Sequence, residues 1–80
     1  MSIYPNPSNK EATVLLRSAS ETDRPIYLIS SLGEVVAQST MVMGHNQASI
    51  NTSLLTEGIY IVQIPGGQKA HSVRKLLVVH

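Results

Sequence analysis

Residues 59–64, Ile-Tyr-Ile-Val-Gln-Ile, decide the fold class of this chain. Every residue of this run except Gln63 is β-branched or aromatic, and such residues are enriched in strands. The run ends at Pro65-Gly66-Gly67, a combination that indicates a tight turn. No window elsewhere shows the sustained apolar period of an amphipathic helix. We therefore predict a chain built from strands, without substantial helix.

Other β-rich runs lie on both sides of this segment, separated by turns rich in Pro, Gly, Asn and Ser. They are Ile3-Tyr4, Ala12–Arg17, Pro25–Ser30, Val35–Ser39, Gln47–Asn51 and His71–Val79. In the third run, Ile26 and Leu28 fall on one face, whereas Tyr27 and Ile29 fall on the other. The turn at 30–34 joins it to the fourth run as a hairpin.

About seven short strands separated by turns are typical of two antiparallel sheets packed face to face. We therefore predict an all-β fold, an immunoglobulin-like β-sandwich of about seven antiparallel strands. The chain has 80 residues, so we predict a single domain over residues 1–80. The Cys and Trp of the true immunoglobulin signature are missing. The pattern therefore implies the architecture alone.

Composition excludes several classes of protein. The chain is 42% hydrophobic and 14% charged, which is too apolar for a disordered tail. Its net charge is +1 with scattered Lys and Arg, so we expect no nucleic-acid partner. It has no cysteine, which excludes disulfides and thiolate metal sites. No apolar run approaches the roughly 20 residues of a membrane span, and the N-terminus lacks the pattern of a signal peptide.

The polar residues do not form a recognisable catalytic or metal-binding pattern. The histidines, which are His45, His71 and His80, lack the spacing of a short metal motif. The carboxylates, which are Glu11, Glu21, Asp23, Glu34 and Glu57, fall mostly in predicted turns, where solvated charges are expected. No serine stands in a Gly-x-Ser-x-Gly elbow. We predict that the chain is not an enzyme and uses no metal or cofactor.

Four stretches form a recognisable set. The first is Ile3-Tyr4-Pro5-Asn6-Pro7-Ser8-Asn9, and the second is Tyr27 to Val36. The third is Ile50 to Leu54, which leads into Glu57-Gly58-Ile59-Tyr60 and the rest of the run to Ile64. The fourth is Lys75-Leu76-Leu77-Val78-Val79. In this order and spacing they closely resemble the type A C-terminal sorting domain of the type IX (Por) secretion system. Two places depart from the family pattern: Ile61 and Gln63 stand where an aromatic or a basic residue is frequent, and Met41-Val42-Met43 matches no family feature.

The resemblance implies a secretion signal that directs a cargo protein across the outer membrane. It implies an N-terminal cargo domain in the full protein, transit through the periplasm, and arrival at the cell surface or in the medium. The implied partners are the outer-membrane secretion translocon and a sortase-like cysteine protease, which removes the domain in many cargoes. Two alternatives stay open: a retained docking module of a secretion-machinery component, and an adhesion or carbohydrate-binding β-sandwich.

The candidate recognition residues are those of the matching motifs. They are Tyr4, Pro5, Asn6, Pro7, Gly58, Tyr60, Lys75, Leu76, Leu77, Val78 and Val79. We expect the Tyr-Pro-Asn-Pro stretch to anchor the first strand. We expect Gly58 to need a positive φ, and Tyr60 to pack in the core with its hydroxyl at the rim. For residues 75–79, recognition and core packing both remain open, because a terminal strand can serve as a template for a partner.

Overall fold

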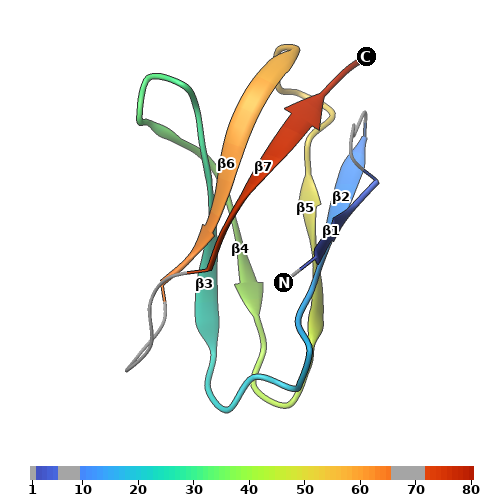
Figure 1. Cartoon of the computed structure of the whole chain (residues 1–80), viewed down its shortest axis with the longest axis vertical. Coiled ribbons are helices and arrows are strands. Elements are labelled where there is room, and N and C mark those ends of the chain that lie inside the picture. Colours follow the sequence, from blue (N-terminus) through green and yellow to red (C-terminus); the bar gives the residue numbers. More distant parts are fainter. Residues whose placement is uncertain (1, 6–9, 66–71) are drawn as a thin grey trace.

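The computed structural model describes residues 2–5, 10–65 and 72–80, apart from the side chain of Ser72. This part of the chain forms seven strands and no helix (Figure 1). The strands are β1 (Ser2–Tyr4), β2 (Glu11–Leu15), β3 (Arg24–Ile29), β4 (Val35–Met41), β5 (Gln47–Asn51), β6 (Gly58–Ile64) and β7 (Ser72–Val78). The predicted all-β sandwich is thereby confirmed.

The strands pair in two antiparallel sheets, one in the order β1-β2-β5 and the other in the order β4-β3-β6-β7. Neighbours along the chain form the hairpins β3–β4 and β6–β7, whereas β2 pairs with β5 and β3 pairs with β6. The chain therefore crosses between the sheets after β2, β4 and β5. The edge strands β1 and β7 lie beside each other along one side of the sandwich, and β4 and β5 lie beside each other along the opposite side (Figure 1).

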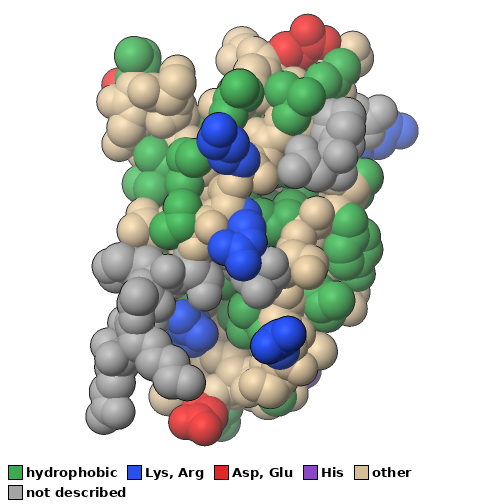
Figure 2. All heavy atoms as spheres, in the orientation of Figure 1, with side chains coloured by type: hydrophobic (Ala, Val, Ile, Leu, Met, Phe, Trp, Pro, Cys, Tyr) green, Lys and Arg blue, Asp and Glu red, His purple; other side chains and the backbone are tan. Residues whose placement is uncertain are grey.

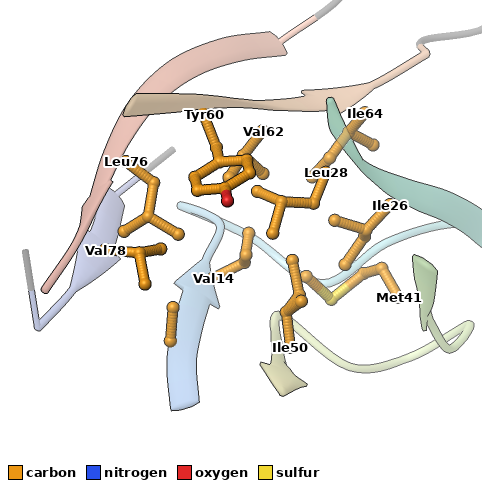
Figure 3. Packing of buried hydrophobic residues seen from close by; sticks show 11 residues of the cluster. Val14, Ile26, Leu28, Met41, Ile50, Tyr60, Val62, Ile64, Leu76 and Val78 are labelled. Carbon is orange, nitrogen blue, oxygen red and sulfur yellow. The ribbon is translucent and has the colours of Figure 1, made fainter. Parts of the chain in front are cut away.

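Alternate residues of both sheets point inward and form one hydrophobic core (Figure 3). Its members are Ala12, Val14, Ile26, Leu28, Met41, Ile50, Tyr60, Val62, Ile64, Leu76 and Val78. Most of these side chains are fully buried. The alternation predicted for β3 is confirmed, because Ile26 and Leu28 are buried while Tyr27 and Ile29 are only partly buried. Period-two burial of this kind holds each strand in register.

Two strand boundaries differ from the sequence prediction in an informative way. We expected a strand to end at Ser39, but β4 continues to Met41, which is 0% exposed. The methionine that matched no family feature is therefore a core residue, opposite Arg24 in the β3–β4 register. Conversely, β2 ends at Leu15, and the backbone N–H groups of Leu16 and Ser20 donate to the carbonyl oxygens of Asn46 and His45 in the loop after β4. The predicted turn at 65–69 lies almost entirely outside the described residues.

Tyr60 links the hydrophobic core to residues 52–57, the connector between β5 and β6. Its ring is buried, and its hydroxyl donates a hydrogen bond of 2.6 Å to the carbonyl oxygen of Thr56. The same hydroxyl lies 3.2 Å from the Thr56 Oγ1 atom. Immunoglobulin-like sandwiches use a similar device, the tyrosine corner, in which a Tyr hydroxyl binds backbone a few residues upstream. The expectation of a core tyrosine with its hydroxyl at the rim is confirmed.

Replacing Tyr60 by Phe tests this contact. The Y60F variant keeps the buried ring and leaves the Thr56 carbonyl without its partner, so we expect a loss of about 1–2 kcal/mol in the free energy of unfolding. Urea denaturation measures it. Tyr27→Phe is the matched control, because no hydrogen bond of the Tyr27 hydroxyl occurs within the described residues. Equal stability of the two variants would contradict a structural role for the Tyr60 hydroxyl.

Candidate recognition surface

The connector between β5 and β6, residues 52–57, is fixed by hydrogen bonds of its own residues. The Asn51 Oδ1 atom accepts bonds from both the backbone N–H and the hydroxyl of Ser53, at 2.9 and 2.7 Å. This is the side-chain-to-backbone turn that Asn favours. The Thr52 N–H donates to the Lys10 carbonyl at 2.8 Å, and Thr52 is fully buried. The connector is therefore held against the start of β2.

The residues after β7 bind to this same connector. The backbone N–H of His80 donates to Glu57 Oε1 at 2.8 Å, and the His80 Nε2 atom lies 2.5 Å from the Leu55 carbonyl oxygen. Gly58 pairs with Val78 in the β6–β7 register. The structure thus brings the Glu-Gly-Ile-Tyr motif and the end of the Lys-Leu-Leu-Val-Val motif into direct contact. In the sequence His80 was considered only as a possible metal ligand, and this role was missed because its partners stand more than twenty residues away.

Gly58 begins β6 with a φ of +157°. The expectation of a positive φ at this position is confirmed. A Cβ atom built there meets nothing within 4 Å, so the requirement for glycine comes from the backbone and not from crowding. Non-glycine residues rarely adopt this region, and forcing one into it costs about 1–3 kcal/mol.

Replacing Gly58 by L-Ala and, separately, by D-Ala distinguishes backbone strain from loss of contacts. We expect L-Ala at position 58 to lower the free energy of unfolding by about 1–3 kcal/mol. D-Ala at the same position adds the same methyl group but favours positive φ, so it should leave stability near that of the natural domain. Chemical synthesis of the chain with either residue, followed by thermal unfolding, measures the difference. If both alanines destabilise equally, strain at Gly58 is not the cause.

The residues of β7 alternate between core and surface. Leu76 and Val78 are fully buried, and they complete the core beside Tyr60. Lys75, Leu77 and Val79 are exposed, the last two at 39% and 41%. The motif at 75–79 therefore divides into two packing positions and three outward positions.

The outward side of β7 continues into an apolar surface on β6. Leu77 is the register partner of Ile59, which is 57% exposed, and Val73 on the same side of β7 is 43% exposed. Lys75 lies opposite Ile61 in the same register and supplies the charge on this surface. We call Ile59, Val73, Lys75, Leu77 and Val79 the β7 outer row. Contiguous exposed apolar side chains flanked by charge are typical of protein-binding surfaces.

Tyr4 and Pro5 lie at the end of β1, which runs toward the end of the sandwich where β7 finishes (Figure 1). Tyr4 pairs with Thr13 of β2 and is 46% exposed. Asn6 and Pro7, the other two residues of this motif, lie outside the described residues. The exposed tyrosine ring adds to the surface available at this end of the fold.

No three of the His, Asp and Glu side chains in the described ranges come together in a way that could hold a metal ion, and His71 lies outside them. No helix in the described part of the chain has the length and apolar character of a membrane span.

The described residues thus form an antiparallel β-sandwich in which the edge strand β7 presents exposed apolar side chains and a lysine. Over residues 2–79 the chain matches the family described as the secretion system C-terminal sorting domain. It belongs to this family, and it is a C-terminal sorting signal for type IX secretion. The resemblance seen in the sequence motifs is thereby confirmed. A comparison with curated proteins finds no match.

Proposed function

We propose that the secretion system recognises this domain in its folded state, through the β7 outer row and the adjoining end of the sandwich. The observation that carries the proposal is the division of the 75–79 motif into buried and exposed positions. Leu76 and Val78 hold β7 in the core, and this fixes the direction in which Lys75, Leu77 and Val79 point. Gly58, Tyr60 and His80 support the same strand by shaping and binding the connector.

Family membership supports a proposal for the finer steps of the route. The domain is one sorting unit over residues 1–80, continuous with an N-terminal cargo domain. Cargo and domain pass through the periplasm, and the outer-membrane translocon binds the β7 outer row and Tyr4-Pro5-Asn6-Pro7. A sortase-like cysteine protease then removes the domain as the cargo reaches the surface. In this scheme the domain is a sorting signal and a protease substrate, and it catalyses no step.

The carbohydrate-binding alternative has less support in the structure. Sandwiches that bind sugars or ligands on a flat face would present several aromatic side chains together. The chain has three tyrosines and no Trp or Phe, and of these tyrosines only Tyr4 is exposed. A retained docking module would use the same β7 outer row, and it differs from a cleaved signal only in its fate after export.

Site-specific photocrosslinking tests the proposed surface. A photoreactive phenylalanine at Leu77, in a domain fused to a periplasmic reporter in a type IX-competent host, should crosslink to an outer-membrane component. The matched control places the same residue at Gln38, which is exposed on β4 at the opposite edge of the same sheet. We expect the product at position 77 alone. A product at 38 and none at 77 would move the recognition surface away from β7.

A further inference from the structure

A cavity of about 450 Å³ opens between the two sheets, beside the edge strands β1 and β7. Its lining comes from three separate segments of the chain. The lining residues are Ser2, Leu15, Leu16, Arg17 and Arg74. The volume falls within the roughly 300–1,000 Å³ range of ligand pockets. The β7 outer row lies on the other face of β7, so this cavity is a separate surface.

Arg74 occupies an unusual position in its strand. By alternation it shares the inward side of β7 with the buried residues Leu76 and Val78, yet it is exposed at the open side of the sandwich. Its Nη1 atom donates to the Val73 carbonyl at 2.8 Å, which uses one of the five N–H donors of the guanidinium. An inward charge on an edge strand discourages edge-to-edge aggregation, and Arg74 alone would suffice for that role.

A second guanidinium reaches the same cavity from the opposite sheet. Arg17 follows β2 and is exposed, and no hydrogen bond or ion pair of its side chain occurs within the described residues. No Asp or Glu is among the lining residues. Figure 2 shows Lys and Arg side chains gathered on this face of the molecule, with the acidic side chains at its ends. Two arginines that line one cavity, with no Asp or Glu in its lining, favour an anionic ligand.

The other three lining residues indicate which chemical groups a ligand of this cavity would carry besides a negative charge. Leu15 and Leu16 are half-buried and supply an apolar wall, and Ser2 supplies a hydroxyl group. The cavity is open to solvent, and it is large enough to hold a ligand bigger than a small inorganic anion. Both bordering strands, β1 and β7, are edge strands of their sheets, and an extended segment can lie along such an edge. These features together fit an extended peptide with an acidic side chain flanked by apolar ones.

We propose that the cavity between β1, β2 and β7 binds an extended acidic peptide segment, whose carboxylate pairs with Arg17 and Arg74. The apolar neighbours of that carboxylate pack on Leu15 and Leu16. This site does not rest on the sorting function, since it can be measured on the isolated chain without a secretion system.

Amide NMR titration of the 80-residue chain tests the site. The probe is an acetylated, amidated hexapeptide of alternating Thr and Val with one central Glu; the comparison peptides are its Gln counterpart and inorganic phosphate. We expect saturable shifts at Ser2, Leu15–Arg17 and Arg74 with the Glu peptide at low salt. We expect affinity roughly tenfold lower for the Gln peptide, and for R17Q or R74Q with the Glu peptide. Added salt should weaken binding.

Two further variants keep the result interpretable. Lys10→Gln removes an exposed positive charge outside the cavity lining and should leave binding unchanged. Arg74→Lys keeps the positive charge but loses the planar guanidinium, which can donate two N–H groups to one carboxylate. The affinity of this variant for the Glu peptide should therefore fall between those of the natural chain and R74Q. Equal binding of the Glu and Gln peptides, or equal losses in K10Q and R74Q, would overturn the proposal. Phosphate that matches the Glu peptide in affinity would also overturn it, because the site would then hold only a simple anion.

Discussion

A folded reporter that already reaches the periplasm should appear at the cell surface or in the medium when this domain is fused to its C-terminus in a type IX-competent host. The expectation follows from membership in the sorting-domain family and from the exposed β7 outer row. Cell fractionation and protease accessibility of the reporter measure the effect. The same reporter without the domain should stay in the periplasm.

The Lys75→Ala variant separates recognition from folding in this assay. Lys75 is exposed, so its loss should change the free energy of unfolding by about 0.5 kcal/mol or less. Export lost with thermal stability intact would place Lys75 in the recognition surface. Deleting β7 is a poorer test, because the deletion would leave β6 as a new unpaired edge and remove Leu76 and Val78 from the core.

One outcome would contradict the sorting function itself. If an established sorting domain exports the reporter in this host and the present domain leaves it in the periplasm, the domain is not an export signal. The retained docking module would then be the better explanation. If the natural domain exports the reporter and K75A changes neither export nor stability, Lys75 is not a recognition residue, and the sorting function is not contradicted.

Truncation of two adjacent leucines should have very different effects on stability. Leu76 is fully buried, so Leu76→Ala removes core contacts and leaves a cavity, at a cost of about 2–5 kcal/mol. Leu77 is 39% exposed, so we expect Leu77→Ala to cost about 1 kcal/mol or less. A domain of this length has a total stability of about 4–12 kcal/mol, from roughly 0.05–0.15 kcal/mol per residue. The L76A variant should therefore lose a large share of the domain's stability and unfold at a much lower urea concentration than the natural domain.

Urea denaturation of the two variants checks this contrast, with equal m-values required before midpoints are compared. Similar losses for both leucines would contradict the alternation of β7. Export adds a second measurement. L76A should lose export together with stability, whereas L77A should lose export while the domain stays folded, if the β7 outer row is the recognised surface.

Local features of the fold could be predicted from the sequence because their causes are local. Alternation of apolar residues places Ile26 and Leu28 on the inward side of their strand whatever the strand pairs with. Gly33 stands in the predicted turn at 30–34, with a φ of +86°. The predicted hairpin follows from the closeness of the two strands in the chain. The Tyr4-Pro5-Asn6-Pro7 opening and the motifs at 57–60 and 75–79, taken together, were likewise sufficient to indicate the family.

The division of these strands between two sheets was decided by tertiary structure. The pairing of β2 with β5 and of β3 with β6 depends on which apolar faces can be buried together, and no local pattern specifies it. Met41 illustrates the point, because a methionine beside a turn is a core residue only where the sheet that contains β4 packs on the other sheet.

The candidate surfaces depend on the same long-range packing. His80 reaches Glu57 only because β7 lies antiparallel to β6, and Arg17 shares a cavity with Arg74 only because the two sheets pack face to face. The sequence by itself determined the strands, their turns and the family to which the chain belongs. Which side chains of each strand meet those of another was decided by burial of both sheets in a single core, since that burial depends on all the strands at once.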